Sequence, residues 1–228
     1  MEKEKVKLNK KELKFAILAT DVVIFAIHED VLKVLLIDVN IPPHYNDIYG
    51  VPGGLILPEE TAEDSVYRHM ENKAGIKNIE IEQLYTFSSV DRDPRGRVVS
   101  VAYFGLTPSI TTNHSNKIYW KDVNKLPRLA YDHKEIIKKA LERLKAKMGY
   151  TTIVRGFLAK EFTLSELQKA YEVVLEKKFD KRNFRKKMLS LGFLKEVGKK
   201  EQDVPNRPAD LYRFSTGSSE TFNILLRN

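Results

Sequence analysis

The chain has 228 residues, enough for one large domain or two modest ones, and its hydrophobic content of 42% allows a well-packed core. It contains no cysteine, which excludes a disulfide framework and thiolate chemistry. The net charge is +8, and residues 177–200 alone carry ten Lys or Arg against two acids, which indicates a polyanionic partner such as nucleic acid.

The N-terminal part of the chain predicts two buried strands. Residues 15–27 form an apolar run that Asp21 interrupts. No small-residue cleavage site follows this run, and it is too short to span a bilayer, so we expect a cytoplasmic protein with no membrane segment. We interpret residues 19–28 as a strand and residues 31–38 as a second strand that is buried on both faces. Residues 41–49 are expected to form a loop.

A glycine pair and a helix pattern follow over residues 53–76. Thr61 can cap the start of this helix and Gly75 can end it. Residues 79–89 and 98–106 then have strand composition. The helix is predicted from apolar residues that recur every four positions on one stripe: Ala62, Val66, Met70 and Ala74.

The stretch from 53 to 76 resembles the Nudix box, the loop–helix signature of diphosphate hydrolases. Five positions match the signature: Gly54, Glu60, Arg68, Gly75 and Ile76. Three acids that the signature requires are absent, and His69, Asn72 and Lys73 stand in their places. In an active Nudix enzyme these carboxylates hold divalent metal ions, which prefer oxygen ligands. The resemblance therefore implies a Nudix scaffold with no catalytic residues, no bound metal and negligible hydrolysis. Lys73 is either a solvated helix lysine or a charge that faces an anionic ligand in place of the metal.

A second polar segment, residues 91–97, places three arginines beside two aspartates. It is either a solvated hairpin tip or an anion clamp, because guanidinium groups bind phosphate bidentately and stay charged. The segment also resembles the corresponding loop of ADP-ribose-type Nudix proteins and their regulatory relatives. That resemblance favours a ligand site made from this loop and the box: Arg92, Arg95, Arg97, Lys73, Arg68 and Glu60.

A helix is predicted to close the first domain, which we assign to residues 1–147. Asp132 is a candidate N-cap, with Glu135 at the capping-box position. His133 is either a ligand contact or a surface residue of the first turn. The resemblance implies an α/β fold for this domain, the α/β/α sandwich of Nudix proteins.

The second domain, assigned to residues 152–228, follows a linker predicted at residues 145–150. Its pattern predicts three helices and two strands: a helix near 153–158, a helix opened by a capping box at 163–166, a helix over 181–191 capped by Asp180, and strands at 193–197 and 209–214. Three helices followed by a two-stranded wing make a winged helix-turn-helix.

The last helix of that motif enters the major groove of DNA. Arginine and asparagine can read guanine and adenine bidentately, and lysine more often contacts phosphate. A solvated helix face without a partner and an RNA-binding face are the alternatives, but the charge concentration and the helix–wing order favour DNA. The predicted contacts lie on the polar side of the last helix and on the wing: Lys181, Arg182, Asn183, Arg185, Lys186 and Arg207.

A broken Nudix box joined to a winged helix resembles the Nudix-related transcriptional regulators over nearly the whole chain. The resemblance implies a homodimeric repressor of NAD or sugar metabolism with no cofactor. It also implies two kinds of partner, a double-stranded DNA operator and a small effector, which is ADP-ribose, a related nucleotide or a sugar. One alternative is an active Nudix hydrolase of ADP-ribose-like diphosphates with an accessory domain. In that case Glu59, Glu60, Glu63 and Glu71 would hold one metal. Another alternative is a winged helix that binds protein.

Overall fold

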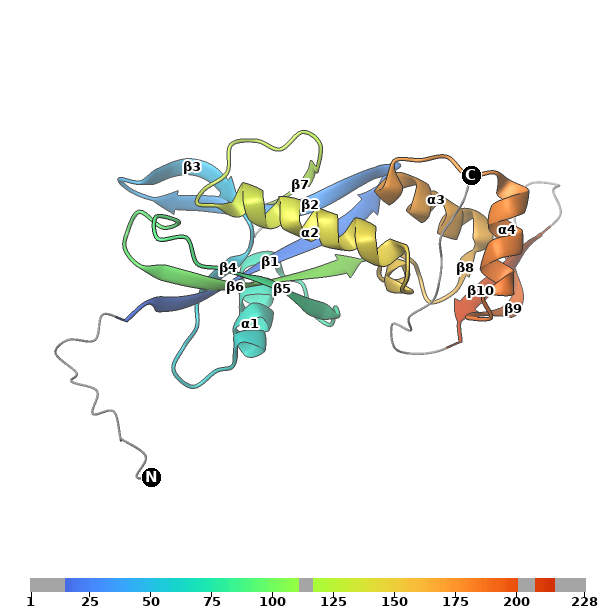
Figure 1. The fold of residues 1–228 in the computed structure, drawn as a ribbon, viewed down its shortest axis with the longest axis horizontal. Coiled ribbons are helices and arrows are strands. Elements are labelled where there is room, and N and C mark those ends of the chain that lie inside the picture. Colours follow the sequence, from blue (N-terminus) through green and yellow to red (C-terminus); the bar gives the residue numbers. More distant parts are fainter. Residues whose placement is uncertain (1–14, 111–116, 201–207, 216–228) are drawn as a thin grey trace, which may run out of the picture.

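The computed structural model describes residues 15–110, 117–200 and 208–215. A sheet flanked by helices makes up the larger part of the molecule, and a smaller helical body with its own sheet lies at one end (Figure 1). The elements of the larger part are β1 (Ile17–His28), β2 (Val31–Ile41), β3 (Tyr45–Gly50), β4 (Gly53–Leu55), α1 (Ala62–Ala74), β5 (Ile81–Phe87), β6 (Val98–Thr107), β7 (Ile118–Asp122) and α2 (His133–Met148). Those of the smaller part are the 3-10 helix η1 (Ile153–Phe157), β8 (Phe162–Thr163), α3 (Leu164–Leu175), α4 (Lys181–Ser190), β9 (Leu194–Lys200) and β10 (Ala209–Phe214).

The large sheet is mixed, with the strand order β3-β2-β1-β6-β5. Strands β1 and β6 run parallel in the centre, in a register that extends from Ile17 opposite Val98 to Ala26 opposite Thr107. The short strand β4 pairs with the first half of β1, and β7 pairs with β2. Because β1 changes its antiparallel partner from β4 to β2 along its length, the sheet divides there and leaves room for a cleft.

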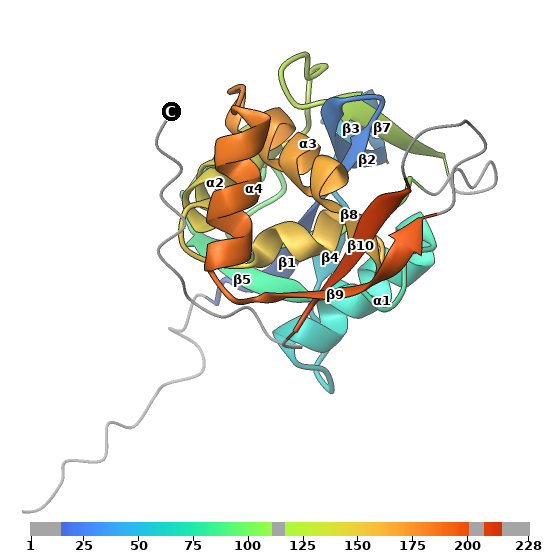
Figure 2. The same ribbon diagram turned by 90° about the vertical axis from the view of Figure 1, so that its right-hand side faces the viewer.

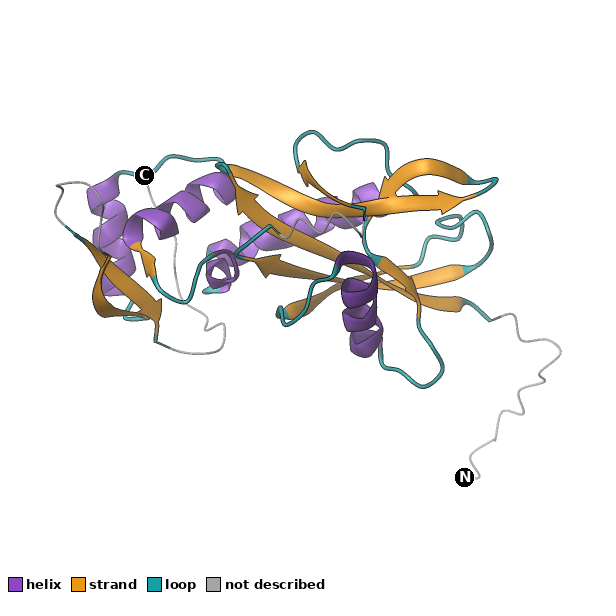
Figure 3. Ribbon diagram, turned by 180° about the vertical axis from the view of Figure 1, so that it is seen from behind, coloured by secondary structure: helices purple, strands orange, loops and turns teal. Residues whose placement is uncertain are grey.

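The two faces of the sheet are covered by different helices, as Figure 3 shows from behind. Alternate residues of a strand point to opposite faces. Val22 and Ile24 accordingly pack with residues of α1, whereas Val23 and Phe25 pack with residues of α2. The predicted α/β/α sandwich is therefore confirmed.

The smaller part is a winged helix domain. Its helices begin where the sequence predicts, because side chains satisfy their first free N–H groups. Thr163 and Glu166 form a reciprocal capping box at the start of α3, and Asp180 Oδ1 accepts a hydrogen bond of 2.8 Å from Asn183 N at the start of α4. The wing strands β9 and β10 form a sheet with the two-residue strand β8.

Several predicted boundaries differ from the structure. The predicted loop at 41–49 contains strand β3, and the sequence did not indicate β7 or β8. The predicted linker at 145–150 is largely helical, because α2 continues to the fully buried Met148. The first helix of the winged helix domain is a 3-10 helix of five residues.

One apolar cluster runs through both parts of the molecule. It joins Phe25 of the sheet and Leu144 of α2 to Val154 of η1, Leu167 of α3 and Phe184 of α4. The two domains that the sequence distinguishes thus share a core. In the part of the chain that the structure describes, no helix is long and apolar enough to cross a membrane.

Candidate functional site

A cleft of about 300 Å³ lies where β1, β2, β4, the end of α1, the arginine loop before β6 and the start of α2 meet. Most of its polar groups are charged. They come from segments far apart in the sequence, and only the folded sheet brings them together: Asp21, Asp38, Lys73, Arg92, Asp93, Arg95 and His133.

Arg92 is the most deeply buried cation of the cleft, with 3% of its side chain exposed. It donates two hydrogen bonds to Asp132 at the start of α2, of 2.9 and 2.7 Å, and one of 3.1 Å to Asp21 of β1. A buried guanidinium needs such carboxylate partners to offset its desolvation. Asp132 does hold the N-cap position of α2, but its side chain makes no cap hydrogen bond, because Arg92 binds it instead. The predicted capping box with Glu135 is therefore wrong.

Asp21 lies at the centre of this charge network. Its carboxylate accepts hydrogen bonds from Ser100 Oγ at 2.6 Å and from Arg92, and His133 Nε2 lies 3.4 Å from Oδ1. Burial by itself would raise the pKa of Asp21. His133, Ser100 and Arg92 outweigh that effect and lower it to about 2. Asp21 is therefore ionised at neutral pH. A charged residue inside an apolar strand pattern was the sequence signal that could have located it.

His133 is buried, so the prediction of a surface residue on the first turn of α2 is wrong. The backbone N–H of Val51 donates to its Nδ1 at 3.1 Å, which leaves the ring proton on Nε2, toward Asp21. The ring thus links the loop before β4 to the centre of the cleft.

The other two arginines of the loop have separate partners. Arg95 lines the cleft, binds Asp93 through two hydrogen bonds of 2.9 and 2.7 Å, and lies over the Tyr131 ring at 5.5 Å. Arg97 lies outside the cleft lining and donates to two backbone carbonyls, those of Ser88 and Ser89. The structure therefore brings only two of the three loop arginines to the cleft.

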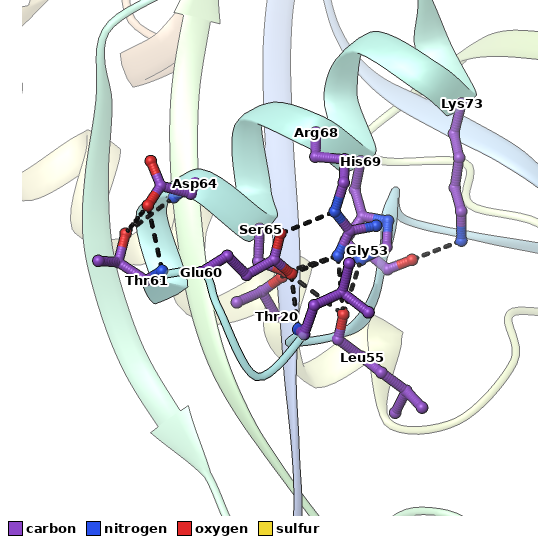
Figure 4. A network of polar contacts seen from close by, with 11 residues as sticks. Thr20, Gly53, Leu55, Glu60, Thr61, Asp64, Ser65, Arg68, His69 and Lys73 are labelled. Carbon is purple, nitrogen blue, oxygen red and sulfur yellow. Dashed lines mark hydrogen bonds and ion pairs between the residues drawn. The ribbon is translucent and has the colours of Figure 1, made fainter.

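The matching residues of the box shape the loop before α1 (Figure 4). Arg68 binds Glu60 through both carboxylate oxygens and also donates to the carbonyl of Leu55 at 3.0 Å. The hydrogen bonds from Arg68 lower the pKa of Glu60 to about 2. Glu60 also accepts from Leu57 N at 2.8 Å. Both side chains hold the loop and lie outside the cleft lining, so their role as ligand contacts stays a prediction.

The three substituted positions of the box differ in their surroundings. His69 is buried beneath Gly54, with Nε2 at 3.3 Å from the carbonyl of Leu55, and Asn72 is exposed. A side-chain carbon at Gly54 would come within 2.6 Å of the His69 ring, so this glycine makes room for it. Lys73 reaches the cleft and donates to the carbonyl of Gly53 at 2.5 Å.

The divalent metal of an active Nudix box does not fit these residues. Within residues 15–110, 117–200 and 208–215, no three His, Cys, Asp or Glu side chains are placed to hold a metal ion. The four glutamates considered for a single metal, Glu59, Glu60, Glu63 and Glu71, are therefore not gathered into a site.

A basic face lies on α4, at the end of the molecule that Figure 2 turns toward the viewer, with the wing beside it. Phe184 and Met188 bury one side of the helix. Arg185 is held by the wing, through Asp210 at 3.3 Å and Tyr212 Oη at 3.4 Å. The predicted wing contact Arg207 lies outside the described residues. The basic face consists of the exposed polar side of α4: Lys181, Arg182, Asn183, Arg185 and Lys186.

Fold and site together define a Nudix domain whose box has His69, Asn72 and Lys73 in place of three acids, fused to a winged helix domain. The NUDIX domain model matches residues 17–144, and the model of the NrtR DNA-binding winged helix domain matches residues 154–214. The chain belongs to the NrtR family of Nudix-related transcriptional regulators.

Two relatives support this assignment, one of them in two structures, and an enzyme also matches part of the chain. The ADPR responsive transcriptional repressor NtrR of Acinetobacter baylyi is 30% identical over 207 residues, which cover 87% of this chain and 82% of that protein. The crystal structure of Shewanella oneidensis NrtR with a 27mer DNA matches with a TM-score of 0.75 at 33% identity, covering 87% of this chain and 93% of that one. The NUDIX domain of the same protein with ADP ribose matches with a TM-score of 0.51 at 34% identity, covering 60% of this chain and 94% of that one.

The ADP-ribose pyrophosphatase of Methanocaldococcus jannaschii is 34% identical over 109 residues, which cover 46% of this chain and 64% of that enzyme.

Proposed function

We propose that this protein is a transcriptional repressor whose winged helix domain binds duplex DNA and whose Nudix domain binds ADP-ribose, or a related nucleotide, without hydrolysing it. One observation carries the proposal: a Nudix cleft whose described residues offer no metal-binding donor set and an exposed basic helix occur in one chain. The similarity to an ADPR-responsive repressor and to a DNA-bound NrtR supports both halves of it.

The basic face supports the DNA half of the proposal. Arg182 and Asn183 are exposed in the first turn of α4, where a recognition helix meets base edges. Lys181 and Lys186 are exposed beside them and suit phosphate contacts. Asp210 and Tyr212 contact Arg185 from the wing, which places its exposed guanidinium group between helix and wing.

The cleft supports the effector half of the proposal. Its volume of about 300 Å³ lies at the lower end of the range for small-molecule sites. Arg92 and Arg95 line it with guanidinium groups that are paired to carboxylates, Lys73 adds an ammonium group, and Tyr131 and His133 add rings. ADP ribose is bound by the matching domain of Shewanella NrtR, which makes a nucleotide diphosphate the first ligand to test.

An active Nudix hydrolase is the second candidate, and the similarity to an ADP-ribose pyrophosphatase favours it. Hydrolysis needs a metal to polarise the diphosphate and to activate water. With His69, Asn72 and Lys73 in the box, we expect no AMP to form when the purified protein is incubated with ADP-ribose and magnesium or manganese. Sustained AMP release that co-purifies with the protein would refute the ligand-sensor proposal and show that the protein is a hydrolase.

Anisotropy titrations with duplex DNA from upstream of the gene test the regulator directly. Arg182→Ala should cost about 1–3 kcal/mol at the preferred sequence and less elsewhere. Lys181→Ala should weaken all duplexes alike and reduce the salt slope by about one unit. The exposed Arg128 of the Nudix domain is the control, and Arg128→Ala should bind like the parent. Binding without sequence preference at about 150 mM salt would refute the proposal.

We also propose that two copies of the chain associate, so that two winged helices read a palindromic operator in the cytoplasm. Most oligomers of soluble proteins are symmetric dimers, and helix-turn-helix dimers bind half-sites one helical turn apart. Light scattering during gel filtration tests this, with a mass near twice that of the 26.3 kDa chain as the expected result.

A further inference from the structure

Lys73 stands where the Nudix signature has an acidic metal ligand. Its side chain carries the opposite charge and lines the cleft. Lys73 extends from the last turn of α1 to the carbonyl of Gly53, apart from the Glu60–Arg68 pair (Figure 4). The residue is exposed, but its ammonium group contacts the wall of the cleft. It lines the same cleft as Arg92 and Arg95.

The ion pairs of the cleft single out this lysine. Arg92 is shared between two carboxylates, those of Asp21 and Asp132, and Arg95 binds Asp93 through both of its oxygens. Among the described cations that line the cleft, Lys73 is the one whose nitrogen contacts a neutral carbonyl and no carboxylate. The positive charge still available to an incoming anion is thus that of Lys73.

The chemistry of a diphosphate explains what this charge can do. A divalent ion in a Nudix box screens the negative diphosphate, and it needs oxygen ligands for that task. An ammonium in its place repels a divalent ion, yet binds phosphate oxygens as a compact point charge. His69 cannot replace the missing ligands, because its ring is buried against Leu55 and Gly54.

We propose that Lys73 takes the place of the divalent metal, as the counter-charge of the diphosphate in the cleft, so that the effector binds without a metal ion. This inference rests on the proposed function, which makes the effector a nucleotide diphosphate. It also explains how the cleft can bind its effector without cleaving it. Hydrolysis needs a metal ion to polarise the diphosphate and activate water, and no such ion would be bound.

Calorimetric titration of the full chain with ADP-ribose, in EDTA and in excess magnesium, tests the inference. The parent protein should bind equally in both buffers, to within about two-fold. Lys73→Met should weaken binding by about ten-fold or more in both, the scale of a charge-assisted hydrogen bond. Lys77→Met is the matched control. Lys77 lies just beyond the same helix, exposed and paired with Glu71, and its variant should bind like the parent.

A second variant gives a signature that a merely structural lysine would not give. Lys73→Glu restores a carboxylate at this position, so binding should fall in EDTA and recover in part when magnesium is added. Parent protein that binds only with magnesium would overturn the inference and leave ADP-ribose as the effector. Unchanged affinity of Lys73→Met would overturn it as well.

Inorganic pyrophosphate separates the inference from the choice of effector. The parent protein could bind pyrophosphate without metal, lose this binding in Lys73→Met, and fail to bind ADP-ribose. That result would support the role of Lys73 as counter-charge and refute the proposed nucleotide effector. Binding of neither compound to the parent protein would refute both. Because parent protein alone gives the comparison between EDTA and magnesium, the test stands even if a variant misfolds.

Discussion

Replacing Arg92 with alanine removes the guanidinium that joins β1 to α2 beneath the cleft. Its side chain is 3% exposed and donates to both Asp21 and Asp132. Removing one partner of a buried ion pair costs about 3–5 kcal/mol, because the remaining charge stays buried. Ser100 and His133 still contact Asp21, so we expect a loss near the lower limit, about 3 kcal/mol in the free energy of unfolding.

The loss should depend on pH. The folded-state pKa of Asp21 is lowered from 3.8 to about 2, so its ionisation stabilises the parent above pH 3.8, and this stability is lost as the pH falls toward 2. The shift corresponds to about 2 kcal/mol. Without Arg92 the pKa of Asp21 rises, so the variant takes up the proton at a higher pH than the parent. The difference in stability between variant and parent should therefore shrink below the pKa of Asp21 in the variant, and the comparison is made at about pH 7 and at about pH 3, the latter between the values of 3.8 and about 2.

Urea unfolding of both proteins at the two pH values measures these differences. Arg97→Ala is the control, because Arg97 is exposed and binds only backbone carbonyls within the described part of the chain. That variant should lie within about 0.5 kcal/mol of the parent. A deficit below about 1 kcal/mol for Arg92→Ala at neutral pH, or the same deficit at both pH values, would refute the reasoning.

Two further predictions concern the winged helix domain. Asp180→Ala removes the hydrogen bond to Asn183 N and should cost about 1 kcal/mol in urea unfolding, whereas unchanged stability would show that the cap is dispensable. Tyr171 is fully buried and its hydroxyl has no partner among the described residues, so Tyr171→Phe should raise the free energy of unfolding by about 1 kcal/mol. A clear loss in that variant would mean that the hydroxyl is hydrogen bonded in solution, for example to a buried water.

Features set by neighbouring residues were predictable from the sequence. Thr61, Thr163 and Asp180 each precede an amphipathic helix, and each caps it in the structure. Gly75 ends α1 in the left-handed conformation, with φ of 66°, as the glycine indicated. These contacts span only a few positions, so one segment contains all the information that they need.

Features set by distant residues were not predictable. Asp132 has the sequence of a helix cap, but Arg92, forty positions earlier, binds its carboxylate. His133 has the sequence of an exposed first-turn residue, but Val51 and Asp21 surround it. The composition of one segment does not specify which distant side chain will contact it. The cleft, which consists of such contacts, could therefore be identified only from the fold.

Short edge strands were hidden for a related reason. Strand β3 (Tyr45–Gly50) carries Asn46 and Asp47, which are typical of turns, and it is held by pairing with β2. Strand β8 has two residues and exists through its pairing with β10. Pairing with a neighbour outweighs local preference in β3, whereas β8 is too short for its composition to show a pattern.

The apolar cluster that crosses from the sheet into the winged helix domain limits how the molecule can be dissected. A cut at Gly149 would expose Met148 on one fragment, and Val154 and Phe157 on the other. Each large apolar side chain that returns to water costs about 1.5–3 kcal/mol. Gly156 also packs so closely on Leu106 that a side-chain carbon there would lie 2.6 Å from Leu106 Cβ. An excised winged helix domain would therefore expose an apolar surface that favours aggregation. Fusing this domain to another protein would require a new partner surface to cover those side chains.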